Sequence, residues 1–152
     1  MLKQKLQEEL KQSMLSRDEM KTSVLRMLLS AVNYYEINKG GAGYTATDED
    51  VLSVIQKEVK QRKDSIEQFK IARRQDLVDK ETKELELLQE YLPEQLSEQT
   101  LITLITQTIK DLGATSIADM GKVMGVLMPK IKAKADAGVV SRIVKEELSP
   151  HS

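Results

Sequence analysis

Several residue types on which enzymes and small stable domains often depend are missing from this sequence. Its 152 residues include no cysteine, no tryptophan, one phenylalanine and one histidine, His151, next to the last residue. Without cysteine the chain can form no disulfide framework, cysteine nucleophile, zinc finger or cysteine-ligated cluster. A single histidine at a terminus cannot serve a Ser-His-Asp triad or a site of several histidines. The sequence therefore predicts no catalytic residue of these kinds, no metal site and no cofactor.

An excess of one charge and long apolar runs are also lacking. The chain carries 23 basic and 24 acidic residues, so a nucleic-acid role would depend on a local basic patch rather than on net charge. No uninterrupted apolar run approaches the roughly 18 residues of a membrane span. The N-terminal sequence MLKQKLQEELKQ is amphipathic and charged, unlike a signal peptide. We therefore expect no membrane contact and a cytoplasmic location.

What the sequence does contain favours helices. Leucine, glutamate, lysine, glutamine, methionine and alanine dominate, and these are good helix formers. Aromatic residues are only 3% of the chain, whereas a β-rich domain needs more β-branched and aromatic residues in alternation. Apolar residues recur every three or four positions through most of the chain, which predicts amphipathic helices. The predicted fold class is all-α, with long N-terminal helices followed by a small three-helix bundle.

Capping residues locate the helices of the N-terminal part, which we assign to residues 1–94. A first helix is expected to break at residues 16–18, and a second to fade at residues 38–41. Thr47 can cap the next helix, with Asp50 in a capping-box position, and that helix should run to about Arg73. Asp76 is a candidate cap for a further helix, which Pro93 should end.

The C-terminal part, residues 95–152, is less charged and richer in β-branched residues. Ser97, Ser116 and Asp136 are placed to cap three short helices, and Gly113 stands where a left-handed residue ends the first of them. Pro129 should end or kink the second helix. Met120, Met124 and Met128 recur every four residues and form either a partner-docking surface or part of the bundle core, which we favour.

Two clusters of basic residues are the candidate nucleic-acid contacts. Lys57, Lys60, Arg62 and Lys63 are opposed locally only by Glu58. The second cluster, opposed only by Asp136, consists of Lys122, Lys130, Lys132, Lys134, Arg142 and Lys145. Such patches can attract phosphates, or can serve solubility and the compensation of helix dipoles. Glu58 and Arg62 also have the spacing of an ion pair on a solvated helix face.

Three stretches of the chain together resemble the bacterial GatB/YqeY-like family, from about residue 25 to residue 148. They are KEVKQRKDSIEQF at 57–69, LQEYLPEQL at 88–96, and DMGKVMGVLMPK at 119–130, which is followed by KAKAD. Residues 95–148 are similar to the tail domain of the B subunit of the glutamyl-/aspartyl-tRNA amidotransferase. The resemblance implies an all-helical protein with a three-helix tail and a link to tRNA-dependent amidation.

In the amidotransferase the tail helps to hold tRNA, so the resemblance implies RNA-facing residues in this chain. By position these are Gly121, Lys122, Gly125, Lys130, Lys132 and Lys134. The family's usual Gly-Lys-Ala-Asp-Gly loop reads Ala133-Lys134-Ala135-Asp136-Ala137 here, with Gly138 one place later. We therefore expect this loop to differ slightly in shape from that of the family.

Three functions follow as hypotheses. The first is a non-catalytic adaptor that contacts tRNA. The second is a protein–protein interaction module that docks an amidotransferase or aminoacyl-tRNA synthetase subunit. The third is a true amidotransferase component. Because no activated cysteine or serine and no ATP/Mg²⁺ signature is visible, we expect no catalysis by the chain alone.

Overall fold

A computed structural model describes residues 1–149, which form helices and turns without a β-strand. The all-α prediction is therefore confirmed for this part of the chain, and His151 lies outside it. The α-helices are α1 (Leu2–Leu15), α2 (Glu19–Gly40), α3 (Asp48–Ile71), α4 (Gln75–Gln89), α5 (Glu98–Leu112), α6 (Met120–Ile131) and α7 (Ala137–Leu148). Two short 3-10 turns, η1 (Gly41–Gly43) and η2 (Ile117–Asp119), precede α3 and α6.

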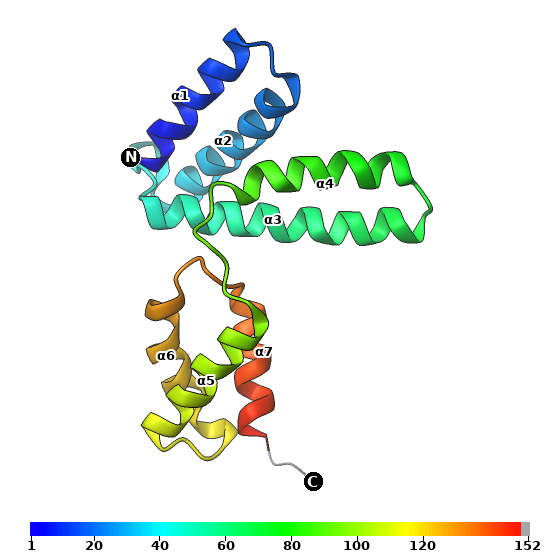
Figure 1. Cartoon of the computed structure of the whole chain (residues 1–152). Coiled ribbons are helices and arrows are strands. Elements are labelled where there is room, and N and C mark those ends of the chain that lie inside the picture. Colours follow the sequence, from blue (N-terminus) through cyan, green and yellow to red (C-terminus); the bar gives the residue numbers. More distant parts are fainter. Residues whose placement is uncertain (150–152) are drawn as a thin grey trace. The chain divides into compact units, whose positions relative to one another are not determined.

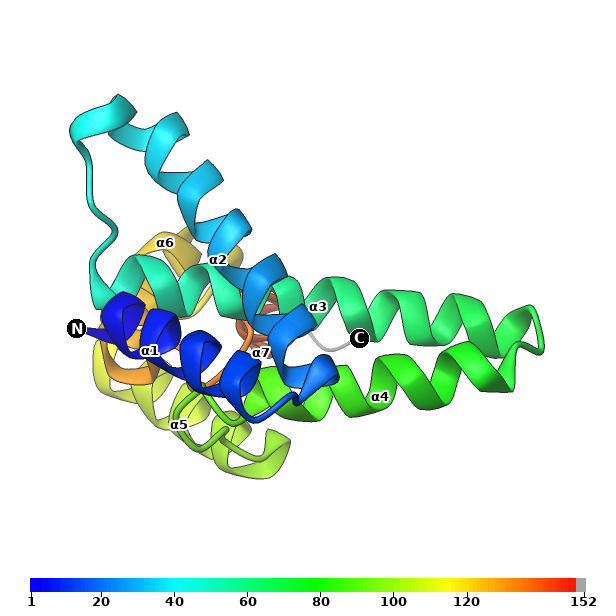
Figure 2. The same ribbon diagram turned by 90° about the horizontal axis from the view of Figure 1, so that it is seen from above.

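The chain divides into two compact units, Met1–Leu92 and Pro93–Ser152, called here the N-terminal and C-terminal units. The N-terminal unit consists of two antiparallel helical hairpins, α1–α2 and α3–α4 (Figures 1 and 2). Its core is aliphatic, because each helix turns one stripe of leucine, valine or isoleucine inward. The turn between α3 and α4 lies away from α1 and α2 in both views.

Polar caps start two helices of the N-terminal unit, α2 and α3. Asp18 accepts a hydrogen bond from the Lys21 amide (3.1 Å) at the start of α2. At α3 the predicted capping box of Thr47 and Asp50 is confirmed, with both reciprocal bonds present. The predicted cap Asp76 is wrong, because α4 begins one residue earlier and Asp76 instead pairs with Arg74.

Helix α4 ends at Gln89, four residues before Pro93, where the sequence predicts its end.

The C-terminal unit packs α5, α6 and α7 around a second aliphatic core that includes Ile105, Val123, Leu127 and Val140. The half-buried side chains of Met120, Met124 and Met128 pack against that core, as the favoured alternative predicts. They therefore offer little surface to a partner.

The predicted turn chemistry of the C-terminal unit is largely confirmed. Ser97 accepts from the Thr100 amide (3.1 Å) and Asp136 from the Val139 amide (3.2 Å), so both are N-caps. Gly113 ends α5 with a φ of 65°, in the left-handed region that glycine enters freely. Ser116 begins η2 rather than α6. Pro129 lies inside α6, which continues for two further residues to Ile131.

Candidate nucleic-acid interface

An exposed glycine face on α6 is the first component of the candidate site. Gly121, Lys122 and Gly125 all lie on the solvent side of the helix, opposite the buried Val123 and Leu127. A Cβ atom added at Gly121 or at Gly125 would meet no other atom within 4 Å. Glycine permits either close helix packing or close approach of another backbone, and these two glycines do not serve helix packing inside their own unit.

Gly125, in the interior of α6, carries an energetic cost that no close packing within the unit offsets, and Gly121, in the first turn, carries a smaller one. Glycine in a helix interior costs about 0.5–1 kcal/mol relative to alanine, because more backbone freedom is lost on folding. What the two positions gain is a bare stretch of backbone that a partner can approach closely. The other expected role, close approach of an external backbone, is therefore compatible with their position.

Lys122 stands beside this bare backbone, next to the turn that begins α6. The Asp119 carboxylate accepts from the Thr115 amide (3.0 Å) and the Ser116 amide (3.3 Å). These bonds, with a smaller attraction from Lys122, hold the pKa of Asp119 below its usual value. The carboxylate is engaged by the turn, while the Lys122 side chain is exposed.

The last turn of α6 and the connector between α6 and α7 hold three further predicted lysines. Lys130, Lys132 and Lys134 all have exposed side chains. Residues that precede α5 fix the connector, since the Leu96 amide donates to the Lys134 carbonyl (2.9 Å). The Gln95 amide group donates to the Ala133 carbonyl (2.7 Å). The loop that carries Lys132 and Lys134 is thus held by hydrogen bonds to Gln95 and Leu96.

Ala133 occupies the position where the family usually has glycine, and its φ is 54°. That angle lies in the left-handed region, which costs a residue with a Cβ roughly 1–2 kcal/mol. Ala137, where the family has its second glycine, is the first residue of α7 and has no positive φ. The loop therefore keeps a left-handed residue at its start and needs none at its end.

Arg142 is exposed but its charge is already balanced by two carboxylates. Its guanidinium lies 3.1 Å from the Glu146 carboxylate and 3.5 Å from that of Glu98. The hydrogen bond to Glu146, followed by the attraction of both carboxylates, raises the pKa of Arg142. A phosphate would have to compete with these two carboxylates for the Arg142 guanidinium.

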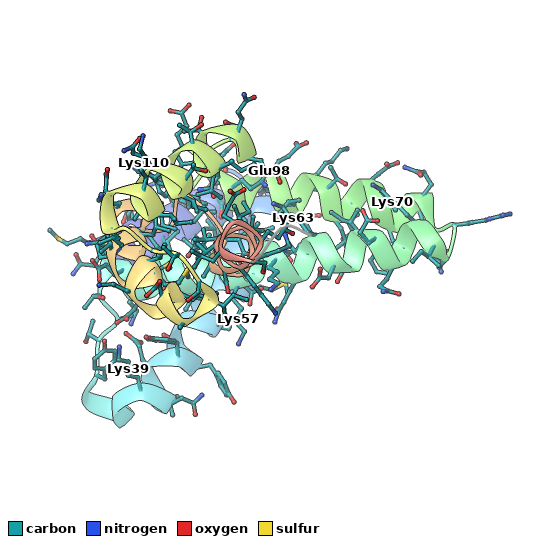
Figure 3. The ribbon with its side chains drawn as sticks, turned by 90° about the horizontal axis from the view of Figure 1, so that it is seen from below. Lys39, Lys57, Lys63, Lys70, Glu98 and Lys110 are labelled. Atoms are coloured by element: carbon teal, nitrogen blue, oxygen red, sulfur yellow. The ribbon has the colours of Figure 1, made fainter. Side chains whose placement is uncertain are left out.

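The predicted basic cluster on α3 divides into two kinds of residue. Lys57, Lys60 and Lys63 have exposed side chains, and Figure 3 labels Lys57 and Lys63. Arg62 is instead buried, with 6% of its surface exposed. The prediction of Arg62 as a solvent-facing contact is therefore corrected.

The partners of Arg62 come from α4 and not from its own helix. Its guanidinium contacts the Glu84 carboxylate and lies 3.1 Å from that of Glu81. It also lies 3.7 Å from the Met27 sulfur of α2. The expected pair with Glu58 is replaced because the α3–α4 interface places two carboxylates closer to the buried guanidinium.

A polar cluster that sequence reasoning missed joins α2 to the start of α3. The Asp50 carboxylate, a member of the α3 capping box, accepts from the Tyr44 hydroxyl and from the Tyr35 hydroxyl (2.9 Å). Lys39 lies 3.4 Å from the same carboxylate and about 5.5 Å from both tyrosine ring centres. The bond from Tyr44 is the main reason why the pKa of Asp50 is strongly lowered.

The same carboxylate shifts the pKa values of its neighbours upward. The pKa of Lys39 is raised by hydrogen bonds to Tyr35 and Asp50, and that of Tyr44 by its bond to Asp50. The spacing of the tyrosines in the sequence could not reveal this cluster, since the turn at 41–47 brings Tyr44 back over α2.

A second missed contact anchors α1 to α2 and to the same turn. The Lys3 ammonium lies 2.8 Å from the buried Glu36 carboxylate, which also accepts from the Ala46 amide (2.7 Å). The bond from Lys3 is the main reason why the pKa of Glu36 lies below its usual value. These contacts are structural and contain no nucleophile activated by a base.

Within residues 1–149, no helix combines the length and apolarity that a bilayer crossing requires. Over the same residues, no group of three histidine, aspartate or glutamate side chains gathers as metal ligands would.

Comparisons with known proteins agree on one family. The Yqey-like protein family matches residues 3–148. An uncharacterized protein of Schizosaccharomyces pombe is 41% identical over 92 residues, covering 60% of this chain and 72% of the relative. A protein of Pyrenophora tritici-repentis named "Altered inheritance of mitochondria protein 41, mitochondrial" is 32% identical over 145 residues, covering 93% of this chain and 78% of the relative. The relative of the same name in Saccharomyces cerevisiae is 37% identical over 87 residues, with 57% and 46% covered.

The family match extends over nearly the whole chain and includes both units. It also includes the α3 lysines, the α6 glycines and the 132–136 loop. The names of the relatives specify no reaction or ligand. The chain therefore belongs to the YqeY-like family.

Proposed function

We propose that this chain is a non-catalytic helical adaptor that contacts tRNA through its C-terminal unit, in association with tRNA-dependent amidation. The observation that carries the proposal is the exposed Gly121–Gly125 backbone of α6, with Lys122 beside it. Two helix-weakening glycines at solvent positions are explained if a phosphate–sugar backbone lies against them. The exposed Lys130, Lys132 and Lys134 would supply the electrostatic attraction.

Two features support an adaptor rather than a catalyst. Three titratable groups have strongly shifted pKa values: burial and a bond to Glu9 raise the pKa of Tyr91, whereas Asp50 and Lys39 are bonded to each other and to tyrosines. Asp50 and Lys39 stabilise the start of α3 and present no base beside a nucleophile. The α6 surface holds lysines and glycines, which suit phosphate contact but not acyl transfer.

The test is binding of fluorescently labelled unfractionated tRNA to the full chain, measured by anisotropy at several salt concentrations. We expect affinity to fall steeply with salt as counterions are released. The triple variant Lys130→Ala/Lys132→Ala/Lys134→Ala should weaken binding and flatten the salt slope by about one unit per lost phosphate contact. Lys110→Ala, an exposed lysine of α5, is the matched control and should change little.

Glycine variants separate RNA contact from folding. Gly125→Ala should stabilise α6 by up to about 1 kcal/mol, because alanine is the better helix former, and Gly121→Ala, in the first turn, should stabilise it by less. Each should nevertheless weaken tRNA binding, because a methyl group would separate the backbone from the RNA. Unchanged tRNA binding in both the lysine and the glycine variants would refute the proposal. Protein partners that survive nuclease treatment, with no tRNA binding at low salt, would favour the docking-module hypothesis instead.

A further inference from the structure

The buried guanidinium of Arg62 uses only part of its hydrogen-bonding capacity. Its Nη1 atom contacts both carboxylates of α4, those of Glu81 and Glu84. Its Nε atom is buried and has no hydrogen-bond partner within residues 1–149. Its Nη2 atom lies 3.7 Å from the Met27 sulfur, and a thioether sulfur is only a weak acceptor. The edge of the guanidinium formed by Nε and Nη2 therefore meets a sulfur in place of an oxygen acceptor.

The same edge of an arginine binds oxygen at another place in this chain. Arg74 donates from its Nε and Nη2 atoms to the two oxygens of the Asp76 carboxylate, at 3.2 Å each. The two N–H groups of this edge point in the same direction, so an oxygen in front of them can accept from both. An oxygen bonded to the Met27 sulfur would lie at this edge of Arg62 and would supply the acceptor that the buried Nε lacks.

The Met27 side chain is open to solvent, although its sulfur contacts a buried group. It is 52% exposed, whereas Met120, Met124 and Met128 pack against the core of the C-terminal unit and are less exposed. The chain has no cysteine, so the methionine thioethers are its only sulfur atoms. Thioethers are oxidised to sulfoxides, and specific reductases reverse the reaction. A small oxidant in solution can therefore reach Met27 in the folded chain.

We propose that Met27 is a site of oxidation by hydrogen peroxide and that Arg62 binds the resulting sulfoxide. The sulfur donates an electron pair to one peroxide oxygen, so that a sulfur–oxygen bond forms and the oxygen–oxygen bond breaks. The leaving hydroxide takes the proton of the transferred oxygen and departs as water. The sulfur is oxidised by two electrons and the peroxide is reduced by two. The new oxygen accepts hydrogen bonds from Nε and Nη2 of Arg62.

Oxidation at this position should strengthen the N-terminal unit. A sulfoxide usually disrupts packing, because a polar group replaces an apolar one. At Met27 the added oxygen meets a buried cation whose donors lack an oxygen acceptor, and hydrogen bonds to charged groups are the stronger ones. Arg62 already joins α3 to α4, and the sulfoxide would join the same guanidinium to α2. Peroxide would thus stabilise the packing of three helices.

A second methionine–arginine contact provides a matched control. Met14 is 50% exposed, and its sulfur lies 3.8 Å from Nη2 of Arg26. Arg26 is itself exposed, so its donors bind water and a sulfoxide oxygen adds little. The full-length variants Met14→Leu and Met27→Leu each keep one of the two paired sulfurs. Peptide mass spectrometry after limited peroxide treatment identifies the oxidised residue, and urea unfolding measures the stability of the N-terminal unit.

The two variants should respond differently to peroxide. In Met14→Leu, which keeps Met27, oxidation should lower the unfolding equilibrium constant of the N-terminal unit about fivefold, as one additional hydrogen bond would. In Met27→Leu the constant should stay the same. An equal response of the two variants, or a loss of stability when Met27 is oxidised, would refute the proposal.

Glutamine tests the hydrogen bond without any oxidation. Its amide oxygen replaces the sulfoxide oxygen, and its helix propensity is close to that of methionine. Met27→Gln should be more stable than Met27→Leu by a similar factor, whereas the same comparison at position 14 should show no gain. The gain at position 27 should vanish in an Arg62→Lys chain, because lysine keeps the charge but has no such edge. Glutamine no better than leucine at position 27 would overturn the role of Arg62.

Discussion

The N-terminal unit buries the polar or charged residues Ser13, Glu36, Asp50, Arg62 and Glu84, whereas the described part of the C-terminal unit buries only Thr108. In the first unit, buried ion pairs and a tyrosine hydrogen bond join each helix to the next one along the chain. In the second, the helices meet through aliphatic side chains, and polar groups act at the turns. Two helical units of one chain therefore specify their folds by different means.

The difference has a consequence for how each unit tolerates change. A buried ion pair favours the arrangement that satisfies it, but removal of one partner leaves an unpaired charge. An aliphatic core accepts changes of shape more gradually, provided that its volume is preserved. The N-terminal unit should therefore be sensitive to charge and pH, and the C-terminal unit to volume and turn chemistry.

The largest expected effect comes from Arg62. Arg62→Met should destabilise the N-terminal unit by about 3–5 kcal/mol, because Glu84 would keep a buried charge without its partner. Urea unfolding together with hydrogen exchange read separately in the two units measures the effect. The double variant Arg62→Met/Glu84→Leu should recover most of the loss, since the remaining partner, the Glu81 carboxylate, is partly exposed to solvent. Equal stability of the single and double variants would contradict this account.

The next largest effect should be a difference in stability between the two units at low pH. Asp50 and Glu36 have folded-state pKa values below their usual ones, so the unfolded chain binds protons more readily at these groups. Their stabilisation is present above about pH 4 and is lost as the pH falls through the lowered folded-state values. Hydrogen exchange at pH 7 and pH 3 should show a larger loss of protection in the N-terminal unit. In the C-terminal unit, Asp119 has a lowered pKa and should give a smaller loss.

Removal of a helix cap should lower the free energy of unfolding of either unit by a similar amount, because a cap bonds only to residues near it in the chain. Thr47→Ala at α3 and Asp136→Ala at α7 each remove one bond to a backbone amide. Each should destabilise its own unit by about 1 kcal/mol, measured by urea unfolding. A much larger cost at Thr47 would show that the capping box and the tyrosine cluster around Asp50 act as a single network.

The smallest expected effect is an increase in the stability of the C-terminal unit. Ala133→Gly should stabilise it by about 0.5–1 kcal/mol, because glycine relieves the left-handed conformation. Ala137→Gly, four residues later in α7, is the control and should give no gain. Thermal unfolding followed by circular dichroism resolves the difference, and a loss at Ala133 would argue against strain in this loop.

Sequence patterns predicted what depends on near neighbours along the chain. The caps Thr47, Ser97 and Asp136 and the left-handed Gly113 are confirmed, since each depends on residues within one turn. Periodicity likewise predicted the all-α fold. Asp76 was wrongly predicted as a cap because Arg74 and Asp76 bond to each other and the helix begins between them.

Contacts between distant residues were out of reach of these patterns. Arg62 matches a solvated helix face by spacing, and only the approach of α4 reveals that it is buried. The Asp50 cluster likewise depends on the turn that folds Tyr44 back. In the C-terminal unit the resemblance pointed to Gly121 and Gly125 as candidates. Only the structure shows that no other atom lies close to them.

The bond between Leu96 and Lys134 places the entry of the chain into the C-terminal unit directly on the loop that carries the lysines. Tension applied to the connecting segment at residues 93–95 would reach this bond and the neighbouring Gln95–Ala133 contact before it reached α5. The loop thus acts as the mechanical attachment point of the unit.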